Sequence, residues 1–327
     1  LTIDFVGYSK DHGTYVFNDI AVKGGRIVQI NDEDFYELDK LSLKSLNQSV
    51  RLEINTDLNA FTKGWIDDLW LSFGAKGVVA MAFWLGALFA EQIRDMHKSY
   101  PFMEIVGEPG AGKSTLVEFL WKLCGRVDYE GFDPSKSTLA ARARNFAQVS
   151  NLPVVLIEGD RGGEDTAKAK GFDWDELKTA YNGRSVRATG VKNSGNDTRE
   201  PPFRGAVVIS QNAEVMASDA VLQRIVHLHF DVASHTDKTK AAAERLERVG
   251  VEAVSGFILK AAKNEAKILE TVRDKTPFYE DLISENKTVK SVRIAKNHAQ
   301  IMALVDALCL VIELSDAQKM AALDKCL

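Results

Sequence analysis

The chain is poor in cysteine, and its cysteines do not form a metal-binding pattern. Cys124, Cys309 and Cys326 are widely separated among 327 residues, whereas zinc sites need Cys or His pairs a few residues apart. Isolated thiols of this kind are typical of proteins in a reducing compartment. We therefore expect buried or inert thiols.

Long apolar runs are also missing. The most apolar stretch, Val78–Ala90, is shorter than the ~20 residues that cross a bilayer, so we expect a buried helix there, with an interfacial segment as the alternative, and no membrane partner. No signal peptide, internal repeat or low-complexity tract is visible in the sequence. The chain begins with Leu1 rather than Met, and we expect it to be a fragment of a longer protein.

The chain has no excess of positive charge, since its net charge is −5. A protein that holds nucleic acid through its overall charge is therefore excluded, and any contact with DNA or RNA must use a local basic patch. Apolar residues make up 45% of the chain, which is enough for a sizeable core. The length allows about two domains of ~150 residues each.

A glycine-rich run that fits G-x-x-x-x-G-K-S/T in full follows the apolar stretch Phe102–Val106. It consists of Gly107, Glu108, Pro109, Gly110, Ala111, Gly112, Lys113, Ser114 and Thr115. Its glycines let the backbone N–H groups cradle phosphate oxygens, and the N-terminus of the following helix adds partial positive charge. We expect Lys113 to reach the β- and γ-phosphates of ATP and the Ser114 hydroxyl to ligate Mg²⁺. The alternative is a glycine turn that ends in Lys-Ser by chance. It does not explain why a strand is predicted before the motif and a helix after it.

A second apolar run, Leu152–Ile157, ends in acidic side chains. An unbroken apolar run of this kind is typical of a buried parallel strand, and ligands bind at the carboxyl ends of such strands. We expect Glu158 to act on the Mg²⁺ side and Asp160 to orient the attacking water. The usual pattern has two adjacent acids, whereas Gly159 separates these two; an acid that merely ends a strand is the alternative.

A third apolar run ends in the amides Gln211 and Asn212. We expect Asn212 to hydrogen-bond the γ-phosphate or the attacking water, with Gln211 as the alternative.

Arg224 then ends a helical stretch and precedes a strand of period two. It is a candidate for stabilising charge on the transferring phosphoryl group, with a surface salt bridge as the alternative. His227 and His229 alternate on that strand, and we predict strand-surface residues rather than metal ligands, because no Cys or carboxylate partner is near in the sequence.

The segment between the second and third apolar runs is basic. It contains Arg184, Arg187, Lys192 and Arg199, with Asp197 as its only acid. Alternation followed by turn-forming residues predicts a β-hairpin with Lys192 near its tip. Cations on a projecting hairpin suit sequence-independent contacts with nucleic-acid phosphates; a solvated hairpin is the alternative.

The chain divides into four regions by pattern. They are a β-rich segment with a hairpin at Lys23–Gly25 and a linker at Asn31–Lys40 (1–45), a helical region (46–99), an α/β layer with a mainly parallel sheet (100–235) and a helical, lid-like region (236–327). In the helical region, Asp57 is predicted to cap a helix that runs through Leu71, and Gly77–Met96 is predicted to form a second helix.

Together, these residues resemble the AAA+ ATPases, particularly replicative helicases of phages, plasmids and other mobile elements related to superfamily three, including the helicase modules of phage primase–helicase fusions. In that resemblance, Gly107–Thr115 matches Walker A, Glu158 matches Walker B, Asn212 matches sensor one and Arg224 matches the arginine finger. The basic hairpin takes the place of the pore hairpin. Arg293, or Lys296 in its place, is the expected sensor-two-like residue.

The resemblance implies an AAA+ P-loop ATPase core that hydrolyses ATP with Mg²⁺ and drives translocation on, or unwinding of, single-stranded DNA. It further implies a ring, a hexamer, in which each site takes Arg224 from the next subunit. Residues 1–99 are expected to link an upstream primase module, and a cytoplasmic location in a bacterium or a phage-infected host cell follows. Two alternatives stay open: an AAA+ nucleotide switch that loads or remodels a protein partner without unwinding, and a P-loop kinase.

Overall fold

The structure is a computed structural model that describes residues 1–157, 172–191 and 195–327. Within this part of the chain, one eight-stranded sheet has the order β13-β8-β12-β9-β2-β3-β4-β5. Its strands are β2 (Val6–Ser9), β3 (Thr14–Phe17), β4 (Ile20–Lys23), β5 (Arg26–Gln29), β8 (Phe102–Gly107), β9 (Val149–Ile157), β12 (Arg204–Gln211) and β13 (Ile225–Phe230). The strands are parallel from β13 to β2 and antiparallel from β2 to β5. The fold is therefore α/β with a large, mostly parallel sheet.

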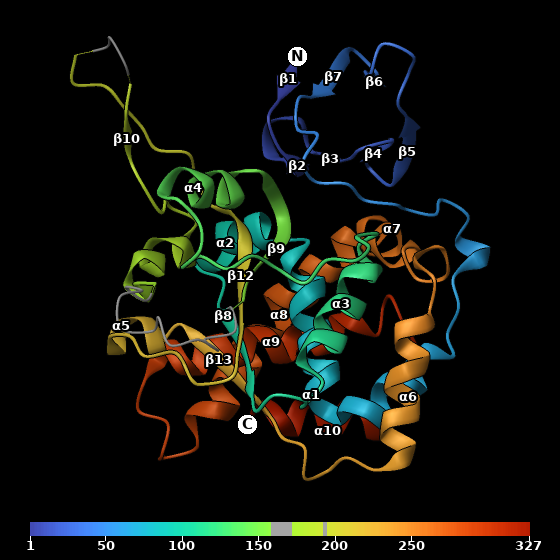
Figure 1. Ribbon diagram of the computed structural model, residues 1–327, viewed down its shortest axis with the longest axis vertical. Helices are drawn as coiled ribbons and strands as arrows, with labels where there is room; N and C mark the ends of the chain where they lie inside the picture. The colour runs from blue at the N-terminus through green and yellow to red at the C-terminus, as the bar shows by residue number, and fades with distance from the viewer. Residues whose placement is uncertain (158–171, 192–194) are drawn as a thin grey trace.

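The helices cover the parallel part of this sheet (Figure 1). The α-helices are α1 (Trp65–Ala87), α2 (Ala90–His97), α3 (Lys113–Leu123), α4 (Leu139–Ala147), α5 (Asp219–Leu222), α6 (Asp237–Arg248), α7 (Gly256–Lys263), α8 (Glu265–Ser284), α9 (Val292–Leu308) and α10 (Asp316–Cys326). The 3-10 helices are η1 (Lys10–His12), η2 (Leu58–Ala60), η3 (Trp174–Asn182) and η4 (Val251–Ala253). Strands β8, β9 and β12 are almost entirely buried, which explains why their sequences are mostly apolar rather than alternating.

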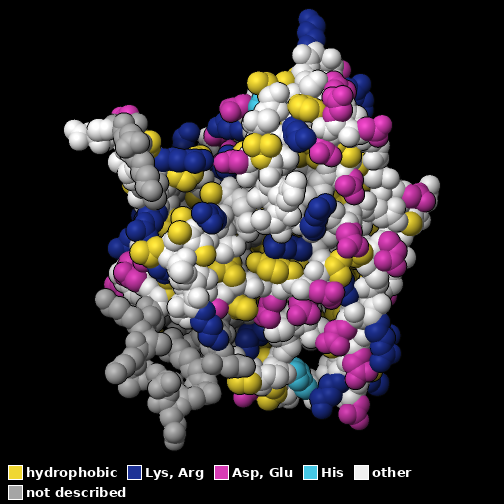
Figure 2. All heavy atoms as spheres, turned by 45° about the horizontal axis from the view of Figure 1, so that its top comes forward, with side chains coloured by type: hydrophobic (Ala, Val, Ile, Leu, Met, Phe, Trp, Pro, Cys, Tyr) yellow, Lys and Arg dark blue, Asp and Glu magenta, His cyan; other side chains and the backbone are white. Residues whose placement is uncertain are grey.

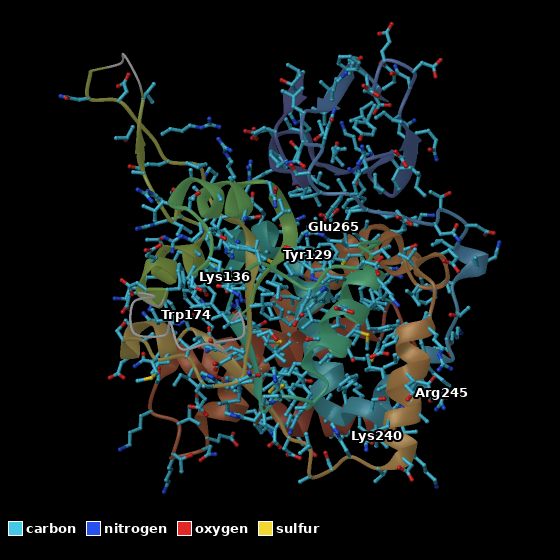
Figure 3. The ribbon with its side chains drawn as sticks, in the orientation of Figure 1. Tyr129, Lys136, Trp174, Lys240, Arg245 and Glu265 are labelled. Atoms are coloured by element: carbon cyan, nitrogen blue, oxygen red, sulfur yellow. The ribbon has the colours of Figure 1, made fainter. Side chains whose placement is uncertain are left out.

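The N-terminal segment is not separate from the central sheet. Strand β2 pairs with β9 in parallel, from Val6 opposite Val149 to Gly7 opposite Ser150. Glu265, at the start of α8, accepts a hydrogen bond from Gln92 of α2 at 2.8 Å and lies 3.5 Å from the Tyr15 hydroxyl of β3 (Figure 3). The N-terminal strands are thus joined to the core through the sheet and through side chains.

A small second sheet in the order β1-β7-β6 lies above the N-terminal part of the central sheet in Figure 1. Its strands are β1 (Thr2–Ile3), β6 (Tyr36–Leu38) and β7 (Leu41–Ser45). The prediction of a linker at Asn31–Lys40 was wrong, because this segment contains β6. Tyr36 and Leu38 are buried while the acidic side chain between them faces water, so the alternation of a half-buried strand was hidden in an acidic stretch.

The prediction of a helix capped by Asp57 was also wrong. The Asp57 side chain accepts a hydrogen bond from the Asn59 backbone N–H in the short helix η2, and the long helix α1 begins only at Trp65. Gly74, with φ 59°, interrupts α1 with a non-helical residue, a conformation that glycine adopts without steric cost. By length and composition α1 is apolar enough to cross a membrane, but 67% of its most apolar window is buried inside the protein. It is a core helix of the fold, as predicted for Val78–Ala90.

The basic hairpin is formed by β10 (Thr189–Gly190) and β11 (Thr198–Arg199), which pair antiparallel. It projects away from the body of the molecule, at the upper left of Figure 1. Its paired part is shorter than the sequence predicted, since the alternating residues before 189 do not belong to a strand.

Candidate functional site

The glycine-rich loop lies at the carboxyl end of β8 and turns directly into α3. A Cβ atom at Gly107 would lie 2.0 Å from the carbonyl oxygen of Phe230 on β13, so only glycine fits there. Gly110 and Gly112 have φ of 83° and 90°, in the left-handed region that favours glycine. The glycines of the motif therefore serve a close strand approach at one position and loop curvature at two others.

Lys113 is at the centre of the site. Its Nζ donates hydrogen bonds to the carbonyl oxygens of Gly107 at 2.5 Å and Glu108 at 3.0 Å, and to Asn212 Oδ1 at 3.1 Å. The residue is only 8% exposed, and burial lowers the pKa of its ammonium, against the opposite effect of Glu130 and Glu108. The loop thus holds a partly desolvated cation on its own carbonyls, with a strand-end amide beside it. A lysine ammonium at this place in a glycine-rich loop can neutralise the charge of a phosphate group.

The two amides at the end of β12 have different partners. Asn212 contacts Lys113, whereas Gln211 is buried and donates to Glu104 Oε1 at 3.3 Å. This separation is possible because β12 lies directly between β8 and β9 in the sheet. The end of β12 is therefore next to the end of β8, and the first polar residue after the strand reaches the loop. Of the two amides considered from the sequence, the structure brings Asn212 to the loop.

Glu130 is a candidate site residue that the sequence reasoning missed. Its Oε1 accepts a hydrogen bond from Ser114 Oγ at 2.9 Å. Its backbone carbonyl accepts from Trp121 Nε1 at 2.9 Å, which ties the segment to α3. A serine hydroxyl and a carboxylate side by side are oxygen ligands of the kind that Mg²⁺ takes directly or through water. Glu130 follows no apolar strand of its own, and its local sequence carries no signal for this position.

Helix α6 closes one side of the loop. Thr115 Oγ1 donates to Glu247 Oε1 at 2.8 Å, and Arg245 Nη2 lies 2.8 Å from Asp68 Oδ1 on α1, which fixes α6 against that helix. Figure 3 shows Arg245 and Lys240 on α6. A cavity of about 380 Å³ opens between the loop, α1 and α6, with Phe73, Gly110, Gly112, Thr115, Thr239 and Lys240 in its lining. It provides room beside the loop for the rest of a nucleotide.

The acids predicted to act on Mg²⁺ and water cannot be placed. Glu158 and Asp160 lie outside the described residues. The strand that leads to them ends at Ile157, which pairs with Ser210 of β12 at the same edge of the sheet as the loop.

Arg224 lies at the opposite end of the parallel strands, beside their first residues. It precedes β13, and its carbonyl accepts from the Phe102 N–H at 2.8 Å where β8 begins. Its guanidinium stacks on the Tyr181 ring at 5.2 Å and donates to the Ala220 carbonyl. Burial lowers the pKa of Arg224, and the neighbouring Arg293 lowers it further. Arg224 is therefore not placed to contact phosphate in the loop of its own chain.

The two sensor-two candidates lie at this same end of the sheet, away from the glycine-rich loop. Arg293 is close enough to Arg224 and Tyr181 to affect the pKa of both. Lys296 donates from Nζ to the His97 carbonyl at the end of α2. Neither lies beside the glycine-rich loop of this chain, and the part of the helical region that reaches the loop is α6.

The prediction that His227 has no carboxylate partner was wrong. Its Nδ1 hydrogen-bonds Glu104 Oε2, and Glu104 is fully buried. Glu104 also accepts from the Val215 N–H at 2.7 Å, and His229 Nε2 lies 3.5 Å from Glu214. The partner was invisible in the sequence because β8 and β13 are neighbours only in the folded sheet. Among the described residues no group of three metal-ligating side chains is present.

The predicted DNA-contacting cations lie mostly at the base of the hairpin. Arg184 and Arg187 precede β10 and are exposed, and Arg199 ends β11. Arg199 Nη2 lies 3.3 Å from Asp4 Oδ2 of the N-terminal segment, a pair exposed enough to contribute little stability. Lys192 lies outside the described residues. Figure 2 shows Lys and Arg side chains gathered beside the base of the hairpin.

The fold is similar to that of a known helicase. No protein-family model and no curated protein matches the sequence. Among solved structures, one described as the SCCmec type IV Cch active helicase matches with a TM-score of 0.63 and 11% identity, over 98% of this chain and 58% of that one. The NrS-1 C-terminal region matches with a TM-score of 0.35 and 13% identity, over 94% of this chain and 90% of that one. The JCV helicase bound to a small molecule matches with a TM-score of 0.32 and 16% identity, over 64% of this chain and 69% of that one.

Only the first of these likenesses is strong enough to define a fold. The chain therefore has a helicase-like α/β fold of the kind found in a mobile-element protein. It spans 58% of the length of that structure.

Proposed function

We propose that this chain is an AAA+-type ATPase that uses ATP and Mg²⁺ to translocate on, or unwind, DNA. The observation that carries the proposal is the position of Lys113, held between the carbonyls of its own loop and Asn212. A lysine at a glycine-rich loop with a polar strand-end residue beside it is the arrangement that P-loop NTPases use on the terminal phosphates. The helicase-like fold makes a nucleic-acid motor the favoured form of such an ATPase.

Each residue of the site has a separate task in this proposal. The loop N–H groups and Lys113 hold the β- and γ-phosphates, Asn212 orients the γ-phosphate or the attacking water, and Ser114 holds the metal ion. Mg²⁺ supplies charge neutralisation at the phosphates when it is bound. Glu130, 2.9 Å from Ser114, would hold water molecules of the bound metal ion. Glu158 and Asp160 remain the proposed metal-side and water-orienting acids.

The proposed assembly is a homo-oligomeric ring, a hexamer as the resemblance to AAA+ ATPases implies. Arg224 lies at the end of the strands away from the loop. An arginine at that end reaches a phosphoryl group only if a neighbouring copy presents one. The basic hairpin is the proposed contact with single-stranded DNA, through phosphates rather than bases. A primase module upstream of residue 1 and a cytoplasmic location are part of the same proposal.

The experiment is to measure ATP hydrolysis with and without single-stranded DNA, across protein concentration, together with strand displacement. We expect DNA to stimulate hydrolysis and the rate per chain to rise with concentration. The Lys113→Ala variant should lose turnover by ~100-fold or more, because the chemistry depends on positioned charge. Near wild-type hydrolysis in Lys113→Ala would overturn the ATPase assignment. Hydrolysis without DNA stimulation or unwinding would replace the motor by a remodeller of a protein partner.

A further inference from the structure

A second cavity, of about 670 Å³, lies at the base of the hairpin, away from the glycine-rich loop. One wall is formed by the two legs of the hairpin, through Asn182–Arg184 before β10 and Pro202 and Arg204 after β11. The N-terminal segment forms the facing wall, and α2 with the residue that follows it forms the floor. Any molecule that follows the hairpin toward the body of the protein therefore meets this cavity.

The lining of the cavity is basic although the chain as a whole is acidic. Its cations are Lys10, Arg94, Lys98, Arg184 and Arg204. Three carboxylates oppose them: Asp11, Glu91 and Asp95. Asp95 is engaged by Lys10 at 2.8 Å, and burial raises the pKa of Glu91. The cavity thus concentrates positive charge on a chain of net charge −5.

Two arginines in the lining, the buried Arg94 and the half-buried Arg204, each have one donor nitrogen without a partner among the described residues. Arg94, only 7% exposed, donates from Nη2 to the Gly205 carbonyl at 2.7 Å and from Nε to the Tyr181 carbonyl at 3.4 Å, while its Nη1 has no partner in the described part of the chain. Arg204 donates from Nη2 to the Ala147 carbonyl at 3.2 Å and stacks on Phe5, while its Nε likewise lacks an acceptor among the described residues. Burial lowers the pKa of Arg94 to about 10, which leaves it charged at neutral pH. Buried donors without acceptors are costly.

We propose that this cavity binds phosphate groups, and that their source is the backbone of the single strand held by the hairpin. The inference rests on the proposed function for its source of phosphate. Arginine donors fixed by carbonyl and ring contacts suit phosphate oxygens, and Arg is the residue of choice for such anions. The strand would pass from the hairpin between the N-terminal segment and α2, so that residues 1–11 take part in holding nucleic acid.

Lys98 offers a clean test because it is exposed and already has a left-handed backbone, with φ 65° at the end of α2. Asparagine tolerates that conformation, so Lys98→Asn removes the charge and keeps the helix end. We expect the slope of log affinity for single-stranded DNA against log salt to shrink by about 0.7, and affinity at 0.1 M salt to fall about fivefold, as for one lost phosphate contact. Asp95→Asn should act in the opposite direction and tighten binding. Lys325→Asn, an exposed lysine on α10, is the matched control and should change neither quantity.

A titration with inorganic phosphate separates the two possible sources. Slope changes of opposite sign in Lys98→Asn and Asp95→Asn support the strand as the source. Unchanged slopes with saturable phosphate binding that weakens in Lys98→Asn support a phosphate site but reject the strand. If both variants match Lys325→Asn in DNA and phosphate binding, the proposal is overturned.

These measurements need no nucleotide, so the cavity and the motor fail separately. If the wild-type chain hydrolyses no ATP, yet Lys98→Asn and Asp95→Asn change the salt slope as expected, the proposed function is overturned and the cavity proposal stands. A chain that hydrolyses ATP and unwinds DNA, with no effect of Lys98→Asn on DNA or phosphate binding, would do the reverse.

Discussion

Removing the Asn212 amide is the sharpest test of the site, because the side chain has one defined contact and contributes little to the stability of the fold. In Asn212→Ala, Lys113 loses its 3.1 Å acceptor and keeps the Gly107 and Glu108 carbonyls. Asn212 is exposed, so the free energy of unfolding should change by no more than about 0.5 kcal/mol. Loss of one hydrogen-bonding group positioned at the reacting phosphoryl group should lower kcat by ~10²–10³, or about 2.7–4 kcal/mol of barrier.

The assay pairs steady-state ATP hydrolysis with equilibrium binding of a fluorescent ATP analogue. Binding should stay within a few-fold of wild type, because the loop and Lys113 still hold the phosphates, while turnover collapses. Asn286→Ala, an exposed asparagine beyond α8, is the matched control and should leave turnover unchanged. A fall in kcat of less than tenfold, with a normal unfolding curve, would show that Asn212 is only a loop residue and that its contact with Lys113 plays no part in the chemistry.

Three further predictions address assembly, the loop and pH. Arg224→Ala should bind ATP but hydrolyse it poorly, and mixing it with Lys113→Ala should restore some activity in mixed rings; no rescue despite proven subunit exchange contradicts a shared site. Gly107→Ala should lower the urea midpoint by more than Gly110→Ala, because its Cβ meets a carbonyl at 2.0 Å whereas Gly110 has open space and only an unfavourable φ; equal shifts contradict this. Burial lowers the pKa of His298, so the unfolded chain takes up its proton first, and stability should fall as pH drops through the unfolded value of about 6.5. His298→Gln should flatten that part of the pH profile of unfolding, and an unchanged profile refutes the assignment.

The glycine-rich loop could be predicted from sequence because all its parts lie within nine consecutive residues. The positive φ of Gly110 and Gly112 and the start of α3 at Lys113 are local requirements that the local letters encode. The position of Asn212 beside the loop also follows from the sequence, because a polar residue that directly follows a buried parallel strand lies at the carboxyl end of the sheet; its role stays a prediction. Its partner Lys113 follows the neighbouring strand β8.

The contacts that sequence reasoning missed join residues far apart in the chain. Glu104 meets His227 across two neighbouring strands, 123 residues apart, and Glu247 meets Thr115 from a helix 132 residues away. No sequence pattern around either carboxylate distinguishes it from an acid on the protein surface. The pairing of β2 with β9 was hidden for the same reason, since parallel pairing joins distant segments without a turn signal.

The separation of Lys113 from Arg224 gives the strongest argument about assembly. Gly107 pairs with Phe230 at one end of β13, and Arg224 precedes Ile225 at the other end. Six residues at ~3.3 Å each place the two ends about 20 Å apart, which is beyond the reach of an arginine side chain. A strand paired with β8 along its whole length does not bend enough to close that distance. If Lys113 and Arg224 act on the same phosphoryl group, they must therefore come from two copies of the chain, and each catalytic site is completed only by assembly.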